Sequence, residues 1–212
     1  MTTKIQYVFW DSDNTLVNTA EHHWRKHFET LKNHGITLED IYRERIYTNN
    51  GAQNWEWISD ELGLTLDKDT YLDQIDHWYF AHINEIKIRD GVLEALNLFT
   101  EKGLPQAVVS NGRRRSVMAA LEAKKLAPHF QFILCKEDYQ GRKPGPEPYL
   151  AAKTMMQQMT GHTIDPQSCL VIEDDPAGVE SGLAAGMQVI HRAQGEDSTP
   201  EFLKNISETL NT

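Results

Sequence analysis

Two aspartates one residue apart, Asp11 and Asp13, are the strongest candidates for chemistry in this sequence. They follow the apolar run Tyr7–Trp10, which is short enough to be a buried parallel strand. Such a strand delivers the residues after it to the carboxyl edge of a sheet, where open α/β folds bind ligands. Two carboxylates held this close repel each other unless a hard divalent cation, most naturally Mg²⁺, lies between them. One acid could then attack phosphorus while the other protonates the leaving oxygen. The alternative is an acidic turn that is only solvated.

Polar side chains follow two later apolar runs, and a lysine lies in a stiff connector between them. Ser110 ends the run that starts at Gln106, and its hydroxyl could hold a phosphate oxygen, although a helix N-cap is the alternative. Lys143 is followed by three prolines within five positions, and a lysine fixed in this way could act as a point charge for a phosphate and a nucleophilic carboxylate. Asp174, just after a second apolar run, is our first choice of metal ligand, while Asp175 precedes a proline as a helix N-cap would.

The elements that position these groups fall into two parts. Between residues 18 and 87 the pattern is helical, with stretches near 21–35, 38–47, 54–62 and 69–82. From residue 88 onward helices alternate with β-branched runs, which predicts a parallel, doubly wound sheet of the α/β class. The predicted strands there are 106–110, 130–135, 169–172 and 188–191, and the predicted helices are 92–101, 116–125, 148–159, one ending at Ala185 and one from Ser198. We therefore expect a core domain of residues 1–17 and 88–212 and an inserted four-helix cap of residues 18–87.

Composition narrows the classes of partner. The 212 residues carry 21 Lys and Arg against 31 Asp and Glu, a net charge of −10, which argues against nucleic acid and anionic membranes as partners. Cys135 and Cys169 belong to no CxxC or Cys/His cluster, so a reduced, cytoplasmic setting is the simplest expectation. We find no signal peptide and no membrane-spanning segment. A small phosphorylated metabolite remains compatible with this balance.

Four motifs in order along the chain resemble those of the haloacid dehalogenase-like (HAD) hydrolases. Residues 11–16, DSDNTL, resemble the DxDGT(L/V) loop, with Asn14 where Gly is usual. Ser110-Asn111 resembles the second motif and Lys143-Pro144 the third. The acidic triplet 173–175, together with the glycines and alanines up to Met187, resembles the fourth. Each motif alone is weak, but the four together are specific.

This resemblance implies a Rossmann-like core and a role for each motif position. Asp11 would be the nucleophile, and Asp13 the general acid and then the general base. Ser110 and Lys143 would bind the transferring phosphoryl group. Asp11, the backbone carbonyl of Asp13 and Asp174 would bind Mg²⁺, with Glu173 in the outer sphere or as a further ligand.

The helical insert resembles the small cap of the phosphoglycolate phosphatase and β-phosphoglucomutase branch. Such a lid excludes water during attack and later admits it. We predict substrate contacts from the loop between the second and third helices, from a cap arginine, from the hinge side of the cap and from the second motif: Asn50, Gly51, Gln53, Arg45, His22 and Asn111. The alternatives are an ordinary polar loop and exposed helix histidines.

The resulting hypothesis is a Mg²⁺-dependent phosphatase acting on a sugar phosphate or phosphoglycolate-like monoester through an aspartyl-phosphate, as a monomer or homodimer. A phosphomutase of the β-phosphoglucomutase kind would use the same motifs. A carbon–phosphorus hydrolase would need an apolar cap lysine, and Lys26, Lys32 and Lys68 do not meet that need. A non-catalytic phosphometabolite sensor would more typically lack one of the catalytic residues.

Overall fold

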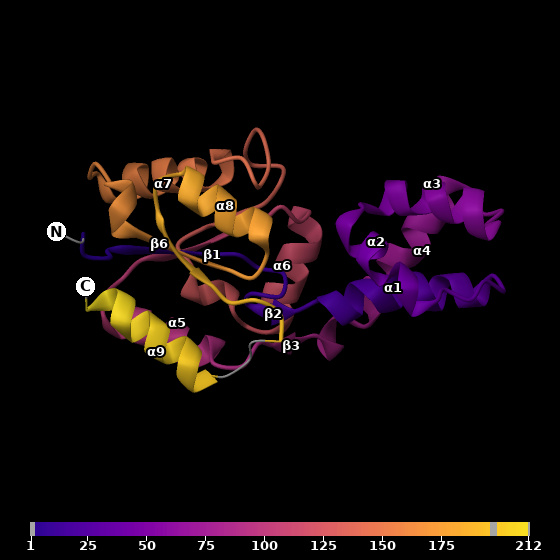
Figure 1. Ribbon diagram of the computed structural model, residues 1–212, viewed down its shortest axis with the longest axis horizontal. Coiled ribbons are helices and arrows are strands. Elements are labelled where there is room, and N and C mark those ends of the chain that lie inside the picture. Colours follow the sequence, from indigo (N-terminus) through magenta and orange to yellow (C-terminus); the bar gives the residue numbers. More distant parts are fainter. Residues whose placement is uncertain (1–2, 196–198, 212) are drawn as a thin grey trace. The chain divides into compact units, whose positions relative to one another are not determined.

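The computed structural model describes residues 3–195 and 199–211. The chain divides into two compact units, Met1–Val17 with Lys87–Thr212, and Asn18–Ile86 (Figure 1). The first unit is built on a sheet and the second is helical. That the helical unit acts as a cap stays a prediction.

Five parallel strands form the sheet of the first unit, in the order β5-β4-β1-β6-β7. Strand β1 occupies the centre, and its Phe9 lies opposite Ala107 of β4 and Val171 of β6. Because β1 is buried on both faces, it is apolar at every position rather than at alternate ones. The strand bounds are Tyr7–Trp10, Gln106–Val109, Ile133–Leu134, Cys169–Glu173 and Gln188–His191 for β1, β4, β5, β6 and β7. The predicted α/β fold with a parallel, doubly wound sheet is confirmed.

Helices cover both faces of this sheet. Phe9 packs in a cluster with Met156 of α7 (Glu147–Thr160), while Trp10, its neighbour in sequence, meets Phe99 of α5 (Val92–Glu101) and Phe202 of α9 (Thr199–Leu210) edge to face. Side chains alternate across a strand, so these two residues serve opposite layers. In Figure 1, α5 and α9 lie together on one side of the sheet, and α7 and α8 (Pro176–Ala184) on the other.

Several predicted bounds shift in the structure. The strand predicted over 130–135 is only Ile133–Leu134, and a 3₁₀ turn at Ala127–His129 precedes it. Helix α6 is Arg114–Ala123 rather than 116–125. Ser198, the predicted start of the last helix, lies outside the described residues, and α9 is described from Thr199. The short strands β2 (Val17–Asn18) and β3 (Lys87–Ile88), which were not predicted, form a separate two-stranded sheet.

The helical unit has its own hydrophobic core. It contains α1 (Ala20–Asn33), α2 (Arg43–Thr48), α3 (Gly51–Leu62) and α4 (Lys68–Ala81). The single helix predicted over 38–47 is wrong, because a 3₁₀ turn at Asp40–Tyr42 comes before α2. The buried apolar side chains of the unit come from all four helices and the segments between them, among them Trp24, Leu31, Leu38, Ile46, Trp57, Ile58, Leu64, Tyr71 and Ile75.

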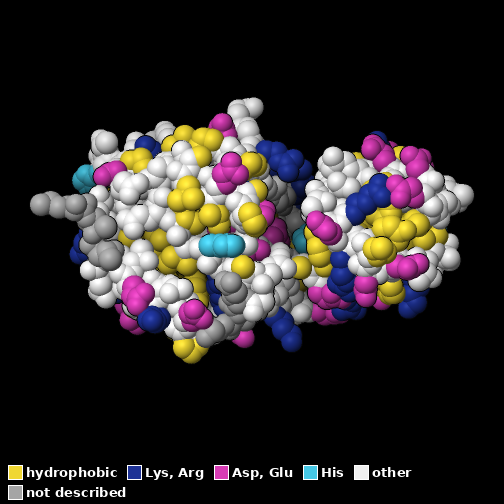
Figure 2. Space-filling view, viewed as in Figure 1, with side chains coloured by type: hydrophobic (Ala, Val, Ile, Leu, Met, Phe, Trp, Pro, Cys, Tyr) yellow, Lys and Arg dark blue, Asp and Glu magenta, His cyan; other side chains and the backbone are white. Residues whose placement is uncertain are grey.

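The surface is mixed in charge. Acidic and basic side chains are interspersed over the face shown in Figure 2. Among the described residues, the helices are too short or too polar for any of them to cross a membrane.

Candidate active site

The carboxyl ends of three neighbouring strands bring the predicted site residues to one edge of the sheet. Asp11 follows β1, Ser110 follows β4, and Glu173 ends β6 with Asp174 next in the chain. The register of the strands aligns these residues along the strand direction, since the Asp11 backbone N–H donates to the carbonyl of Ile172 at 3.0 Å. Parallel pairing of these three strands therefore brings Asp11, Ser110, Glu173 and Asp174 to the same edge of the sheet.

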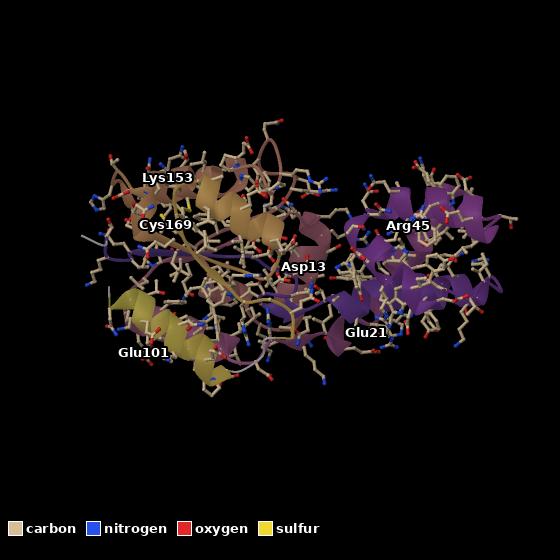
Figure 3. All side chains as sticks on the ribbon, in the orientation of Figure 1. Asp13, Glu21, Arg45, Glu101, Lys153 and Cys169 are labelled. Atoms are coloured by element: carbon tan, nitrogen blue, oxygen red, sulfur yellow. The ribbon has the colours of Figure 1, made fainter. Side chains whose placement is uncertain are left out.

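The turn after Asp11 explains the asparagine at position 14. Asn14 has φ +57°, in the left-handed region that glycine adopts most easily and that asparagine tolerates best among the other residues. Its backbone N–H donates to the carbonyl of Val17 at 2.7 Å, and the N–H groups of Leu16 and Val17 both donate to the carbonyl of Ser12. This tight turn fixes the backbone beside Asp11 and Asp13, which is labelled in Figure 3.

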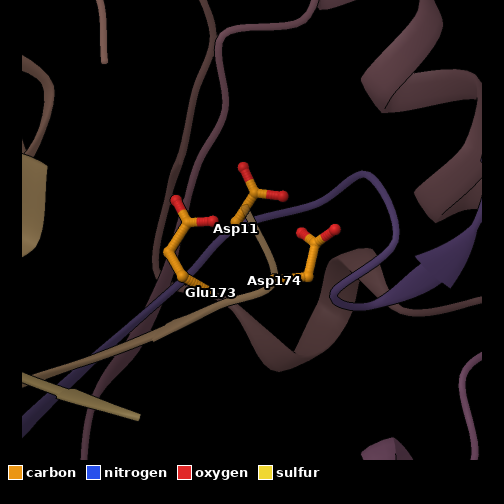
Figure 4. Close-up of side chains that lie close together, drawn as sticks. All are labelled: Asp11, Glu173 and Asp174. Atoms are coloured by element: carbon orange, nitrogen blue, oxygen red, sulfur yellow. The ribbon is translucent and has the colours of Figure 1, made fainter. Parts of the chain in front are cut away.

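Three buried carboxylates form a compact acidic cluster at this edge (Figure 4). Ligand oxygens of Asp11, Glu173 and Asp174 all lie within 4.8 Å of one another. Burial raises the pKa of Asp174 to about 6, even though Thr15 Oγ1 donates to its Oδ1 at 2.8 Å. Burial also raises the pKa of Asp11 well above its ordinary value, and the charge of Glu173 raises it further. An all-oxygen donor set that concentrates negative charge out of water fits a hard divalent cation.

Lys143 supplies positive charge inside the cluster. Its side chain is buried, and Nζ donates to Asp11 Oδ1 at 2.7 Å, to Glu173 Oε1 at 2.5 Å and to the Val109 carbonyl at 2.8 Å. These three bonds use all three N–H donors of the ammonium. Burial alone would lower the pKa of Lys143, but the carboxylates outweigh burial and raise it well above its usual value. The ammonium is thus held charged against Asp11.

Asn111 clasps the backbone of Lys143. Its Oδ1 accepts from the Lys143 N–H at 3.2 Å, and its Nδ2 donates to the Lys143 carbonyl at 3.4 Å. Tyr139 donates from its hydroxyl to the Ser110 carbonyl at 2.7 Å. In this structure Asn111, predicted as a substrate contact, joins the second and third motifs. Its contact with substrate stays a prediction.

Ser110 and Asp13 face Gly112. The Gly112 N–H donates to Ser110 Oγ at 3.0 Å, and a Cβ built on Gly112 would lie 3.1 Å from Ser110 Oγ and 3.3 Å from Asp13 Oδ2. The Ser110 hydroxyl and the Asp13 carboxylate therefore share one side of the site. Ser110 is not a helix N-cap, because α6 begins after Arg113.

The predicted contacts in the loop before α3 have local structural partners. Asn50 caps α3: its side chain accepts from the N–H groups of Ala52 and Gln53, and Gln53 Oε1 accepts from the Asn50 N–H at 3.0 Å. A Cβ on Gly51 would come within 2.9 Å of Leu72, so this glycine lets α3 approach α4. These side chains form a capping box. Their contact with a substrate stays a prediction.

Two further predicted contacts also pack within the helical unit. Arg45, labelled in Figure 3, pairs with Glu61 at 2.7 Å, and its guanidinium lies 4.3 Å from the Trp57 ring centroid. His22 is buried, with Nε2 3.0 Å from the Tyr79 carbonyl oxygen, and burial lowers its pKa. Both side chains already have partners, and their roles toward substrate stay predictions.

Sequence reasoning missed two buried residues that support the site. Tyr149 donates its hydroxyl to Glu173 Oε1 at 2.6 Å. The Arg89 guanidinium donates to the backbone carbonyls of Asn14, Arg192 and Ala193 at 2.7, 2.7 and 2.5 Å, which holds the turn after Asp13. A tyrosine in a helix reads as an ordinary core residue and a single arginine carries no motif, so only the closeness of Tyr149 to Lys143 in sequence was a usable signal.

This arrangement agrees with what comparison with known proteins shows. Residues 8–191 match the family model of haloacid dehalogenase-like hydrolases. The chain belongs to this family. It is 29% identical to the 6-phosphogluconate phosphatase of Escherichia coli over 200 residues, covering 89% of this chain and 83% of the relative. It is 28% identical to hexitol phosphatase A of the same organism over 188 residues, covering 85% and 80%.

The fold of this HAD hydrolase also has solved counterparts. A β-phosphoglucomutase from Clostridium difficile aligns with a TM-score of 0.76 at 20% identity, covering 98% of this chain and 97% of that one. At this identity the similarity shows the fold alone. The family and enzyme class predicted from the four motifs are confirmed.

Proposed function

We propose that this HAD hydrolase is a Mg²⁺-dependent phosphatase that hydrolyses a small phosphate monoester through an aspartyl-phosphate on Asp11. The observation that carries the proposal is the buried contact of 2.7 Å between Lys143 Nζ and Asp11 Oδ1, inside a cluster of three carboxylates. An ion pair of this kind opposes the rise in the pKa of Asp11 that burial causes, and it holds the carboxylate in one orientation. The family membership and the phosphatases among its relatives support it.

The residues divide the reaction into two displacements. A carboxylate oxygen of Asp11 forms a bond to phosphorus while the bond from phosphorus to the ester oxygen breaks, and Asp13 gives its proton to the leaving oxygen. Asp13 then accepts a proton from a water whose oxygen attacks the same phosphorus. The bond from phosphorus to Asp11 breaks, which releases inorganic phosphate and restores the Asp11 carboxylate. Throughout, the Ser110 hydroxyl donates to a non-bridging oxygen of the phosphoryl group, and the positive charge of Lys143 beside Asp11 offsets the negative charge of that group.

Asp11, Asp174 and the backbone carbonyl of Asp13 would hold Mg²⁺. The cation would neutralise charge on the phosphoryl oxygens and on the two carboxylates. The raised pKa values of Asp11 and Asp174 are the mark of carboxylates that gain from a bound cation. Thr15 fixes one oxygen of Asp174 by its hydrogen bond of 2.8 Å and so orients the carboxylate as a ligand.

Sugar and polyol phosphates are the substrate class we propose. Two relatives are phosphatases named for 6-phosphogluconate and for hexitols. The net charge of −10 disfavours polyanionic macromolecules, whereas a single phosphate needs only a local positive group such as Lys143. In this proposal residues 18–86 form the lid that selects the ester.

The test is release of inorganic phosphate from a panel containing 6-phosphogluconate, sorbitol 6-phosphate, glucose 6-phosphate and phosphoglycolate, with Mg²⁺ or with EDTA. Asp11→Asn removes the nucleophile with almost no change of shape, and Asp60→Asn, in exposed helical surface, is the matched control. We expect turnover that requires Mg²⁺, drops by about a thousandfold or more in Asp11→Asn and persists in Asp60→Asn. Turnover that survives in Asp11→Asn would refute the mechanism. Conversion of β-glucose 1-phosphate to glucose 6-phosphate without phosphate release would replace the phosphatase with a phosphomutase.

A further inference from the structure

Glu173 is held by two donors at a single oxygen. Its Oε1 accepts from Lys143 Nζ at 2.5 Å and from the Tyr149 hydroxyl at 2.6 Å. The residues are buried, with exposed fractions of 1% for Glu173, 5% for Lys143 and 0% for Tyr149. Lys143 Nζ also lies 5.0 Å from the centroid of the Tyr149 ring, close enough for a cation–π attraction.

The backbone of α8 approaches the Glu173 carboxyl group closely at Gly178. A Cβ built on Gly178 would stand 2.1 Å from Glu173 Cδ and Oε1, so the absence of a side chain there makes the space that the carboxyl group occupies. The carboxylate is therefore packed against the helix backbone at Gly178 and is also held by Tyr149 and Lys143.

Glu173 can interact with either of two groups at this position. It lies in the acidic cluster with Asp11 and Asp174, within reach of a cation that those residues would hold. It also pairs with Lys143, which in turn pairs with Asp11. The Tyr149 hydroxyl decides between them, because a hydrogen bond to Oε1 anchors the carboxylate on the lysine side.

We propose that Tyr149 is a positioning residue: its hydroxyl holds Glu173 on Lys143, and Glu173 in turn holds the ammonium against Asp11. The inference rests on the proposed function in one respect, since it assigns a purpose to Lys143 that only phosphoryl transfer needs. Without the hydroxyl, Glu173 retains the lysine as its only anchor and is free to rotate toward Asp174. The Lys143 ammonium is then held less firmly in its position beside Asp11.

The matched pair for the test is Tyr149→Phe and Tyr71→Phe. Each substitution removes one hydroxyl from a fully buried tyrosine and keeps the ring. Tyr71 lies in the helical unit, where its hydroxyl oxygen is 2.5 Å from His27 Nδ1. General effects of losing a buried hydrogen bond are thus common to both variants, whereas an effect on Lys143 belongs to Tyr149→Phe alone.

The first readout needs no turnover. In ¹H–¹⁵N correlation spectra of the lysine ammonium groups, the Lys143 signal is identified by its loss in Lys143→Met. We expect exchange of its protons with water to be about fivefold or more faster in Tyr149→Phe, and changed by less than about twofold in Tyr71→Phe. An unchanged Lys143 signal in Tyr149→Phe would overturn the proposal. If Tyr149→Phe does not fold, Gly178→Ala, which displaces the Glu173 carboxyl group, must speed the same exchange.

The second readout is a double-mutant cycle on the preferred ester. We expect Tyr149→Phe to lower kcat by about fivefold to tenfold with KM changed by less than about twofold. In a Glu173→Gln background the same substitution should change kcat by less than about twofold, because the ring is kept and the link from the hydroxyl to Lys143 through Glu173 is already altered. Equal effects in both backgrounds would show that Tyr149 does not act through Glu173. If the unmodified protein releases no phosphate, the proposed function fails, while the exchange experiment still decides the role of Tyr149.

Discussion

Gly178 offers the sharpest test of how the acidic cluster is packed. Glycine in a helix interior is ordinarily unfavourable, so Gly→Ala there usually stabilises a protein by up to about 1 kcal/mol. At Gly178 of α8 the added Cβ would lie 2.1 Å from Glu173 Cδ, far inside van der Waals contact. The carboxylate must move, and its bonds to Lys143 and Tyr149 are lost or distorted. The expected sign of the substitution is therefore reversed.

The magnitude follows from those two bonds. Both bonds are made to the Glu173 carboxylate, and a hydrogen bond to a charged group contributes about 1.5–3 kcal/mol. After the helical gain of about 1 kcal/mol is subtracted, loss of both bonds in Gly178→Ala should lower the free energy of unfolding by about 2–5 kcal/mol. Urea unfolding near neutral pH with EDTA, followed by circular dichroism, measures this change.

Glu173→Ala provides the control for this reasoning. In that background the space beside Gly178 is vacant of the carboxylate, so adding Gly178→Ala should be neutral or stabilising by up to about 1 kcal/mol. The effect of Gly178→Ala on the free energy of unfolding is thus expected to change sign when Glu173 is replaced by alanine. A Gly178→Ala protein as stable as the unmodified chain, or an equal loss in both backgrounds, would refute the packing argument.

Three other predictions concern residues away from that contact. Asn14→Gly should leave stability nearly unchanged, while Asn14→Ala should cost about 1 kcal/mol in urea unfolding because φ is +57°; equal stability of the two variants would contradict the strain. Arg89→Met, which removes a buried guanidinium from three carbonyl oxygens, should lower the free energy of unfolding by about 3 kcal/mol or more; a loss under about 1 kcal/mol would contradict it. Burial keeps the pKa of His27 well below 6.5, so the folded protein holds it neutral while the unfolded chain protonates it. The free energy of unfolding therefore keeps its full value, as far as His27 is concerned, above pH 6.5. It falls by at most about 1.4 kcal/mol per pH unit as pH drops from 6.5 toward the lowered pKa. Urea unfolding of the helical unit, followed by tryptophan fluorescence at several pH values, should show a shallower pH slope in His27→Phe, and an unchanged slope would exclude this histidine as the cause.

The geometry of the candidate site was largely accessible from the sequence. Asp11, Ser110 and Asp174 each follow an apolar run, and parallel strands must bring such positions to one edge. Lys143 stood out because prolines stiffen its connector. The structure brings these residues together, whereas their chemical roles stay predictions. The capping box of Asn50 and Gln53 matches a sequence pattern, an asparagine followed three residues later by glutamine, but we predicted these residues as substrate contacts and the helix from near residue 54.

Other features depend on tertiary contacts that no local pattern records. Tyr149 meets Glu173 across 24 positions and Arg89 meets Ala193 across 104, and neither partner is marked by spacing or composition. The 3₁₀ turn at Asp40–Tyr42 interrupts a stretch that has good helix periodicity, because packing of the helical unit decides where α2 begins. Hydrophobic periodicity thus locates elements, and long-range polar contacts remain invisible to it.

The order of the strands has a consequence for synthesis on the ribosome. Strand β1 is made first, yet both of its neighbours in the sheet, β4 and β6, come about a hundred or more residues later. The helical unit, by contrast, is one continuous segment with its own apolar core, so all of its partners emerge within Asn18–Ile86. We expect the helical unit of the nascent chain to fold first. The apolar segment Tyr7–Trp10 then remains without its strand partners until β4 and β6 have been synthesised. A waiting strand of this kind is a natural substrate for chaperones that bind short exposed hydrophobic segments.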